Sequence, residues 1–165
     1  SLGKSIFTAF GMTKKTGRSA ENDPSLSPLI NASCPAVCVV GKAWDFHVKI
    51  ALGINNNDNL ENIRDTAKHI VKNGKEFLFD AEHFFDGYKS NPNYALDCLK
   101  HAFDQGARWI VLCDTNGGTL PHEVGEIVSK VTKIIPGKNL FRALNVYSRL
   151  SVKIDSDLGA LSSYM

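Results

Sequence analysis

Residues 77–87 read FLFDAEHFFDG, a short apolar run that passes directly into a segment with four ionisable side chains. The same change occurs one unit later, in WIVLCDTNGG at residues 109–118, and one unit earlier, in AVCVVGK at residues 36–42. None of the three apolar runs alternates with polar residues, which is the pattern of strands buried on both faces. The sequence therefore predicts parallel strands, with polar side chains gathered where the strands end.

The segments between these runs have the spacing of amphipathic helices. Apolar residues recur every three or four positions over 60–71, 96–103 and 124–131, so each helix can cover a sheet face. Asn91 followed by Pro92 is typical of a helix start, and Gly74 and Gly106 are placed where helices should end.

A further strand is predicted over residues 5–10, connected through a Gly/Ser/Asn/Asp/Pro-rich stretch at residues 11–35 that we expect to be a mobile loop. Four strand–helix units follow from this count. A doubly wound sheet and a (β/α)8 barrel both repeat the unit, but the chain lacks a GxGxxG turn, which argues against the dinucleotide-binding form of the former. Complete barrels usually need about 250 residues, so we expect an α/β fold that is a partial (β/α)8 (TIM) barrel.

The last residues break this rhythm. We expect residues 1–137 to be the central part of a catalytic barrel and residues 138–165 to be an irregular, divergent tail. Residues 139–146 could start a strand, but no convincing period follows from residue 148 onward.

Composition excludes several classes of protein. The chain has 165 residues, a net charge of +2, 43% hydrophobic and 22% charged residues, which fits a globular domain without an electrostatic footprint for nucleic acid or membrane. It has no apolar run near the ~20 residues of a membrane span, so we expect a cytoplasmic protein, or an organellar one in a eukaryote. The four cysteines are expected to be reduced, and the spacing of Cys34 and Cys38 is not matched by a second pair that would suggest zinc.

The candidate site follows from the rule that ligands bind at the carboxyl ends of parallel strands. Clustered carboxylates, imidazoles and amides there can bind a cation, polarise a carbonyl or move a proton. The residues that follow the strands, and that we therefore expect to bind substrate or catalyse, are Lys42, Asp45, His47, Asp80, Glu82, Asp114, Thr115 and Asn116.

Simpler interpretations compete for some of these residues. Asp114 with the following Asn and Gly residues could be turn chemistry, and Asp45 and His47 could serve a loop or helix cap. Strand alternation places Asp80 and Glu82 on one side and His83 on the other, unless the chain bends.

Four segments in order, residues 6–15, 41–48, 80–92 and 113–123, resemble the barrel domain of the isopropylmalate, homocitrate and citramalate synthases, most closely the (R)-citramalate branch. The resemblance implies a (β/α)8 barrel in which acetyl-CoA condenses with a 2-keto acid, pyruvate in that branch, on the route to isoleucine or leucine. It also implies a divalent metal, Mg²⁺ or Mn²⁺, that polarises the keto carbonyl, and a homodimeric complete enzyme. By motif, Glu82 matches the keto-acid glutamate and Thr115 a substrate-contacting threonine, with Asp80 facing the same pocket.

The sequence also departs from that family. The metal ligands of the family lie in an Arg-Asp pair and a His-x-His motif, and this chain has neither, with no histidine after His122. We therefore expect no metal ligands in this chain and no activity from it as an isolated fragment. Two alternatives stay open: a 2-isopropylmalate synthase that uses 2-ketoisovalerate, and a non-catalytic fragment that pairs with another chain.

Overall fold

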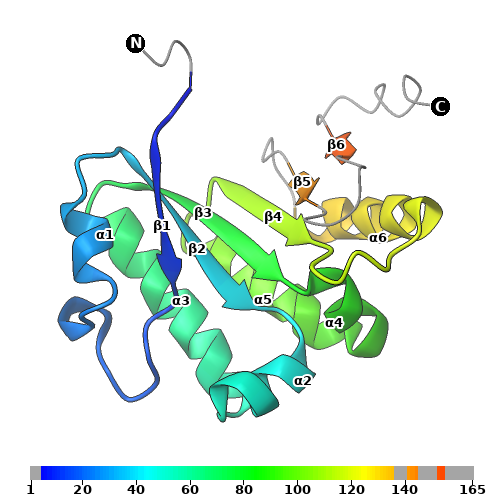
Figure 1. Ribbon diagram of the computed structural model, residues 1–165, viewed down its shortest axis with the longest axis horizontal. Helices are drawn as coiled ribbons and strands as arrows, with labels where there is room; N and C mark the ends of the chain where they lie inside the picture. The colour runs from blue at the N-terminus through cyan, green and yellow to red at the C-terminus, as the bar shows by residue number, and fades with distance from the viewer. Residues whose placement is uncertain (1–4, 136–140, 145–151, 155–165) are drawn as a thin grey trace.

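The computed structural model describes residues 5–135, 141–144 and 152–154, which form a single sheet with helices packed on it (Figure 1). The strands run in sequence order across the sheet. They are β1 (Thr8–Met12), β2 (Ala36–Lys42), β3 (Glu76–Glu82), β4 (Trp109–Cys113), β5 (Phe141–Leu144) and β6 (Val152–Ile154). The helices are η1 (Ala20–Asn22), α1 (Ser27–Asn31), α2 (Asp45–His47), the π-helix η2 (Val48–Leu52), α3 (Asn56–Lys72), α4 (Phe84–Ser90), α5 (Pro92–Asp104) and α6 (Pro121–Ile134).

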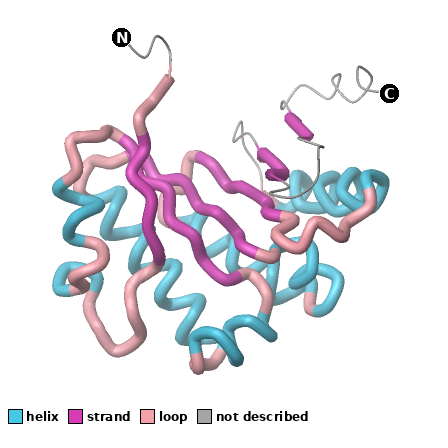
Figure 2. Tube along the Cα trace, in the orientation of Figure 1, coloured by secondary structure: helices cyan, strands magenta, loops and turns pink. Residues whose placement is uncertain are grey.

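Strands β1 to β5 are parallel, as the apolar runs predicted, and β6 is antiparallel to β5. Figure 2 shows the strands as one curved layer, with α3 and α5 behind it. The prediction that both strand faces are buried is only half right, because side chains alternate between buried and half-buried along β2 and β3. Phe77 and Phe79 are buried, and their neighbours on the opposite face are half-exposed. The described helices cover only the first face, so the polar ends of the strands open onto the second, which we call the concave face.

The helix boundaries follow the local signals in the sequence. The Asn91 Oδ1 atom accepts a hydrogen bond from the Tyr94 backbone N–H at 3.3 Å, which caps α5. The helices α3 and α5 are followed by Gly74 and Gly106, whose φ angles of 75° and 95° lie in the left-handed region that favours glycine.

The stretch from residue 11 to residue 35 differs from the mobile loop that its composition predicted. It contains η1 and α1, and between them Asp23 is 1% exposed. The Asp23 carboxylate accepts hydrogen bonds from the backbone N–H groups of Lys15 and Ser25, both at 2.8 Å. Short polar residues favour such ordered turns as readily as they favour loops. Strand β1 also begins later than predicted, at Thr8 in place of residue 5.

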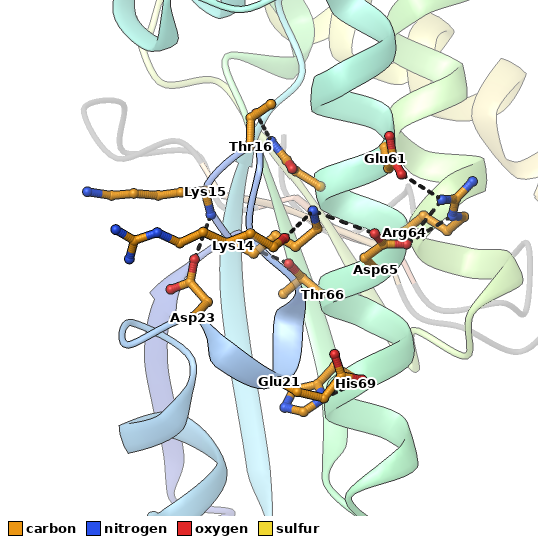
Figure 3. Close-up of polar contacts among 12 residues, drawn as sticks. Lys14, Lys15, Thr16, Glu21, Asp23, Glu61, Arg64, Asp65, Thr66 and His69 are labelled. Atoms are coloured by element: carbon orange, nitrogen blue, oxygen red, sulfur yellow. Dashed lines mark hydrogen bonds and ion pairs between the residues drawn. The ribbon is translucent and has the colours of Figure 1, made fainter.

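A second set of contacts fastens this connection to α3 (Figure 3). The Lys14 backbone N–H donates to the Thr66 Oγ1 atom at 2.9 Å, and the Lys14 Nζ atom lies 3.5 Å from the Asp65 carboxylate. Because the Lys14 side chain is only 6% exposed, these partners offset the cost of burying its polar groups. The carboxyl end of β1 is thereby held at the same edge as the ends of β2 and β3.

The end of the chain is partly described. Strand β5 confirms the strand suggested within residues 139–146, whereas β6 lies where the sequence showed no period. The rest of the predicted divergent tail, residues 138–140, 145–151 and 155–165, lies outside the described residues. Within the described ranges, no helix has the length and apolarity to cross a membrane.

Candidate active site

A lysine and a glutamate end adjacent strands and meet on the concave face. Lys42 and Glu82 are the last residues of β2 and β3 and are paired in the sheet register. The Lys42 Nζ atom forms an ion pair with the Glu82 Oε2 atom, and the two side chains are 18% and 25% exposed. A partly exposed pair of opposite charges can exchange its internal contact for an anionic or hydrogen-bonding ligand.

Asp80 lies two residues before Glu82 and therefore on the same face of β3. Burial raises the pKa of the Asp80 carboxyl above its ordinary value, and a hydrogen bond with the Cys38 thiol partly opposes this. Burial, together with the nearby Asp80 charge, also raises the pKa of Cys38. This thiol is therefore protonated at neutral pH and donates to the carboxyl group.

Three aromatic rings pack beside the Lys42–Glu82 pair, and we call Trp44, His47 and His83 the ring cluster. The ring centroids of Trp44 and His47 are 4.8 Å apart, and those of His47 and His83 are 4.2 Å apart. The pKa of His47 is lowered, first by burial and then by the neighbouring His83 and Lys42, so His47 is neutral at pH 7. Within the described part of the chain, the Trp44 Nε1 atom and the Nδ1 atoms of both histidines are buried without a hydrogen-bond partner.

His83 enters this cluster because the chain bends directly after β3. Its φ and ψ angles are 55° and 32°, and no other non-glycine residue in the described ranges has a positive φ. Its backbone N–H donates to the Thr115 Oγ1 atom at 2.9 Å, and the residue is 7% exposed. The alternation argument alone would have placed His83 away from Glu82. Histidine's tolerance of left-handed backbone is the one signal for the bend that the sequence contains.

The loop after β4 contacts α4 as well. The Asn116 Nδ2 atom donates to the Asp86 Oδ2 atom at 3.0 Å, and that oxygen also lies 3.5 Å from the His83 Nδ1 atom. The structure therefore joins Thr115 and Asn116 to the segment after β3. The sequence places Asp86 among the polar residues that follow β3, but it assigns Asp86 no individual role.

Two of the predicted carboxylates are occupied within the protein. Asp45 accepts hydrogen bonds from the backbone N–H of Phe46 and from the Asn91 side chain, both at 2.8 Å. Asp114 is 2% exposed and accepts from both the backbone N–H and the hydroxyl of Thr119, at 3.1 and 2.9 Å. These contacts agree with the turn and loop interpretations of Asp45 and Asp114. The other predicted residues lie at or just after the carboxyl ends of the strands: Lys42 and His47 at and after the end of β2, Asp80 and Glu82 on β3, and Thr115 and Asn116 after β4.

The described residues do not fit the divalent metal that the family resemblance implies. Within those ranges, no group of three or more His, Cys, Asp and Glu side chains is arranged to hold a metal ion.

Comparison with known structures defines the class of fold. The HMG-CoA lyase of Brucella melitensis matches with a TM-score of 0.62 at 15% identity, over 84% of this chain and 47% of the lyase. The hydroxymethylglutaryl-CoA lyase of Pseudomonas aeruginosa matches with a TM-score of 0.65 at 12% identity, over 86% and 46%. The chain is thus part of a (β/α)8 barrel, with its polar side chains at the end where barrels of this class bind ligands.

Comparison with curated sequences finds relatives of the chain among two kinds of synthase. The (R)-citramalate synthase of Aquifex aeolicus is 46% identical over 158 residues, which is 96% of this chain and 28% of that enzyme. That of Geobacter sulfurreducens is 49% identical over 135 residues, 81% of this chain and 25% of that enzyme. A 2-isopropylmalate synthase of Acetivibrio thermocellus is 28% identical over 116 residues, covering 70% of this chain and 20% of that enzyme. No protein-family model matches the chain.

The motif resemblance is confirmed: this chain is a relative of the (R)-citramalate synthases. It spans about a quarter of the length of the curated relatives that it matches.

Proposed function

We propose that this chain supplies part of the catalytic barrel of an acyltransferase of the citramalate synthase type. Such an enzyme joins the acetyl group of acetyl-CoA to the carbonyl carbon of pyruvate, and hydrolysis of the thioester then releases CoA. The observation that carries the proposal is the identity of 39–49% to five (R)-citramalate synthases, against 28% to the 2-isopropylmalate synthases. The alternative of a bulkier keto acid is therefore not favoured.

The concave face offers groups suited to a small keto acid. In the proposal, Lys42 attracts the substrate carboxylate and Glu82 contacts the keto acid. The Thr115 hydroxyl already accepts the His83 N–H, so its own proton remains available to donate to substrate. Asp80 and Asn116 complete the polar wall.

Other predicted residues have supporting parts in this proposal. Neutral His47 borders the Lys42–Glu82 pair, and Asp45 and Asp114 hold the loops that carry the site through the hydrogen bonds described above. For the complete protein we propose acetyl-CoA and a 2-keto acid as substrates, a homodimeric state and a cytoplasmic location. The (R)-citramalate synthase relatives support these statements.

A segment exchange tests the proposal. The matching segment of the Geobacter sulfurreducens enzyme is replaced by that of this chain, and citramalate formation is measured with pyruvate and 2-ketoisovalerate in competition. We expect an active chimera that prefers pyruvate. Glu82→Gln should lower its kcat/KM by about 100-fold or more, as loss of a charged substrate contact does. Glu76→Gln is the matched control, because Glu76 lies at the opposite end of β3 and bonds Trp109.

The result against the proposal is equally specific. A chimera that makes no citramalate, or one that prefers 2-ketoisovalerate, contradicts the assignment. Equal activity of the Glu82→Gln and Glu76→Gln variants contradicts the role given to Glu82.

A second candidate, a fragment that pairs with another chain, is favoured by the edge of the sheet. Within the described residues, β1 has a strand neighbour on one side only, and Phe7 and Phe10 are 68% and 64% exposed. Such an unprotected edge is a template for pairing. Light scattering after size-exclusion chromatography should then show that the molecular mass of the unaltered chain rises with protein concentration. The Phe10→Glu variant should remain a monomer at every concentration. A monomer at every concentration in the unaltered chain would exclude this candidate.

A further inference from the structure

His83 has three properties that its packing alone does not explain. It holds a left-handed backbone at φ 55°, a conformation that non-glycine residues adopt uncommonly. It is 7% exposed, yet its Nδ1 atom has no hydrogen-bond partner in the described part of the chain. An uncommon backbone conformation and an unsatisfied buried nitrogen at one residue are features that concentrate at functional sites.

A carboxylate is poised to supply that missing partner. The Asp86 Oδ2 atom lies 3.5 Å from the His83 Nδ1 atom, about 0.6 Å beyond the usual length of an N–H···O hydrogen bond. Contacts of this kind are often long without substrate and shorten when it binds.

Both members of the pair are held from the same loop. Thr115 accepts the backbone N–H of His83 at 2.9 Å, and the adjacent Asn116 donates to Asp86 at 3.0 Å. The loop after β4 therefore fixes the histidine and the carboxylate relative to each other. Thr115 and Asn116 are consecutive in sequence, and each makes a hydrogen bond to one member of the His83–Asp86 pair.

Of the two imidazoles in the ring cluster, His83 has a carboxylate oxygen within ion-pair distance in the described part of the chain, whereas His47 feels the Glu82 and Asp86 charges from farther away. A proton held on Nδ1 by Asp86 makes Nε2 the unprotonated nitrogen, which is the form that accepts a proton. Glu82 is less suited to this task, because its carboxylate is already paired with the Lys42 ammonium.

We propose that His83 is a catalytic residue that transfers a proton at its Nε2 atom, and that Asp86 is the positioning residue that fixes its tautomer. This inference rests on the proposed function. The Nε2 lone pair takes a proton from the methyl carbon of the acetyl thioester, and the C–H electron pair becomes that of the enolate. The enolate carbon bonds to the keto carbon, whose carbonyl becomes an alkoxide. The imidazolium, whose charge Asp86 offsets, returns its proton to that alkoxide.

Glycine is the informative substitution, because it accepts the left-handed backbone of residue 83 and leaves room for free imidazole. In the active chimera, His83→Gly should lower kcat by about 100-fold or more, the usual contribution of a general acid–base. Added imidazole should raise the kcat of the His83→Gly variant by at least about tenfold. It should not raise the activity of Glu82→Gln, which has an intact His83. An active His83→Gly variant overturns the inference.

A measurement on the 165-residue chain itself tests the His83–Asp86 pair without an activity assay. It applies if free imidazole does not enter the space left by His83→Gly, or if the chimera is inactive. In ¹⁵N-histidine NMR spectra, His83 should be in the Nδ1–H tautomer, and Asp86→Ala should convert it to the Nε2–H tautomer. Asp104→Ala, which removes an exposed carboxylate elsewhere, should change nothing. A His83 that is in the Nε2–H form, or one that ignores Asp86→Ala, overturns the dyad. Because this readout needs no activity, the dyad and the proposed function can fail separately.

Discussion

A single methyl group at residue 87 should destabilise the protein, because α4 lies against the backbone after β2 at that point. A Cβ atom built on Gly87 would lie 2.2 Å from the Ala43 carbonyl oxygen and 2.9 Å from the Trp44 Cα atom. Real Cβ atoms keep at least 3.0 Å from such atoms, so the two segments must separate by 3.0 − 2.2 = 0.8 Å. Both neighbours are backbone atoms and cannot rotate away. Forced overpacking of this kind costs about 1–3 kcal/mol.

Gly125→Ala is the matched control for Gly87→Ala. Gly125 lies within α6, and a Cβ atom there meets nothing within 4 Å. Both substitutions gain the same helix propensity, about 0.5–1 kcal/mol, so the difference between them isolates the clash. Urea unfolding followed by circular dichroism should place Gly87→Ala about 1–3 kcal/mol below Gly125→Ala, or roughly 2–4 °C in Tm per kcal/mol.

The reasoning fails if Gly87→Ala is as stable as Gly125→Ala. It also fails if Gly125→Ala is destabilised by as much, since that would show a general intolerance of alanine and no specific close approach. The position matters for the site as well, because Asp86 precedes Gly87, and the separation of 0.8 Å would disturb its contacts with His83 and Asn116.

Three further outcomes are expected. Thr66→Val should lower the free energy of unfolding by about 1–3 kcal/mol, because it leaves a buried backbone N–H unpartnered. Thr132→Val removes an exposed hydroxyl and should change the free energy of unfolding by no more than about 0.5 kcal/mol. Equal destabilisation of the two variants in urea unfolding would contradict the role given to the hydrogen bond between Lys14 and Thr66. Burial raises the pKa of the Cys98 thiol to about 12, so Cys98 should react with a thiol reagent at pH 8 only after unfolding. Its contribution to stability should persist below the unfolded pKa near 9 and disappear as the pH rises toward 12; rapid labelling of Cys98 in the folded chain would refute this. Protonation of His47, stacked on Trp44, should quench the Trp44 fluorescence in a variant whose other tryptophan is phenylalanine. Because the pKa of His47 is lowered, the midpoint should fall below the ordinary histidine value of about 6.5, and a midpoint above it would be incompatible with the buried ring.

The sequence predicted the features that depend on local periodicity. Unbroken apolar runs indicated parallel strands, and Asn91 with Pro92 marked the start of α5. Both features depend on residues that are close together in the sequence. The choice of a (β/α)8 barrel over a doubly wound sheet implied strands in sequence order, which is the order observed. The candidate site was predicted in outline for the same reason, since Lys42 and Glu82 each end a strand.

Features that depend on distant contacts were not predictable. The connection at residues 11–35 is ordered partly by the bond from Lys14 to Thr66, 52 positions away, which no local pattern reports. His83 was set aside because alternation was extended one residue too far, past the point where its φ becomes positive. The pairing of Asp86 with Asn116 likewise requires knowing how α4 and the loop after β4 approach each other.

The central place of β3 in the sheet has a mechanical consequence. Its backbone is hydrogen-bonded to β2 on one side and to β4 on the other, so freeing it requires both ladders to open together. Amide hydrogen exchange should therefore be slowest around Asp80, while Thr115 and Asn116, on a turn, exchange earlier. The turn after β4 can therefore open locally while the strand that carries Asp80 and Glu82 stays hydrogen-bonded in the sheet.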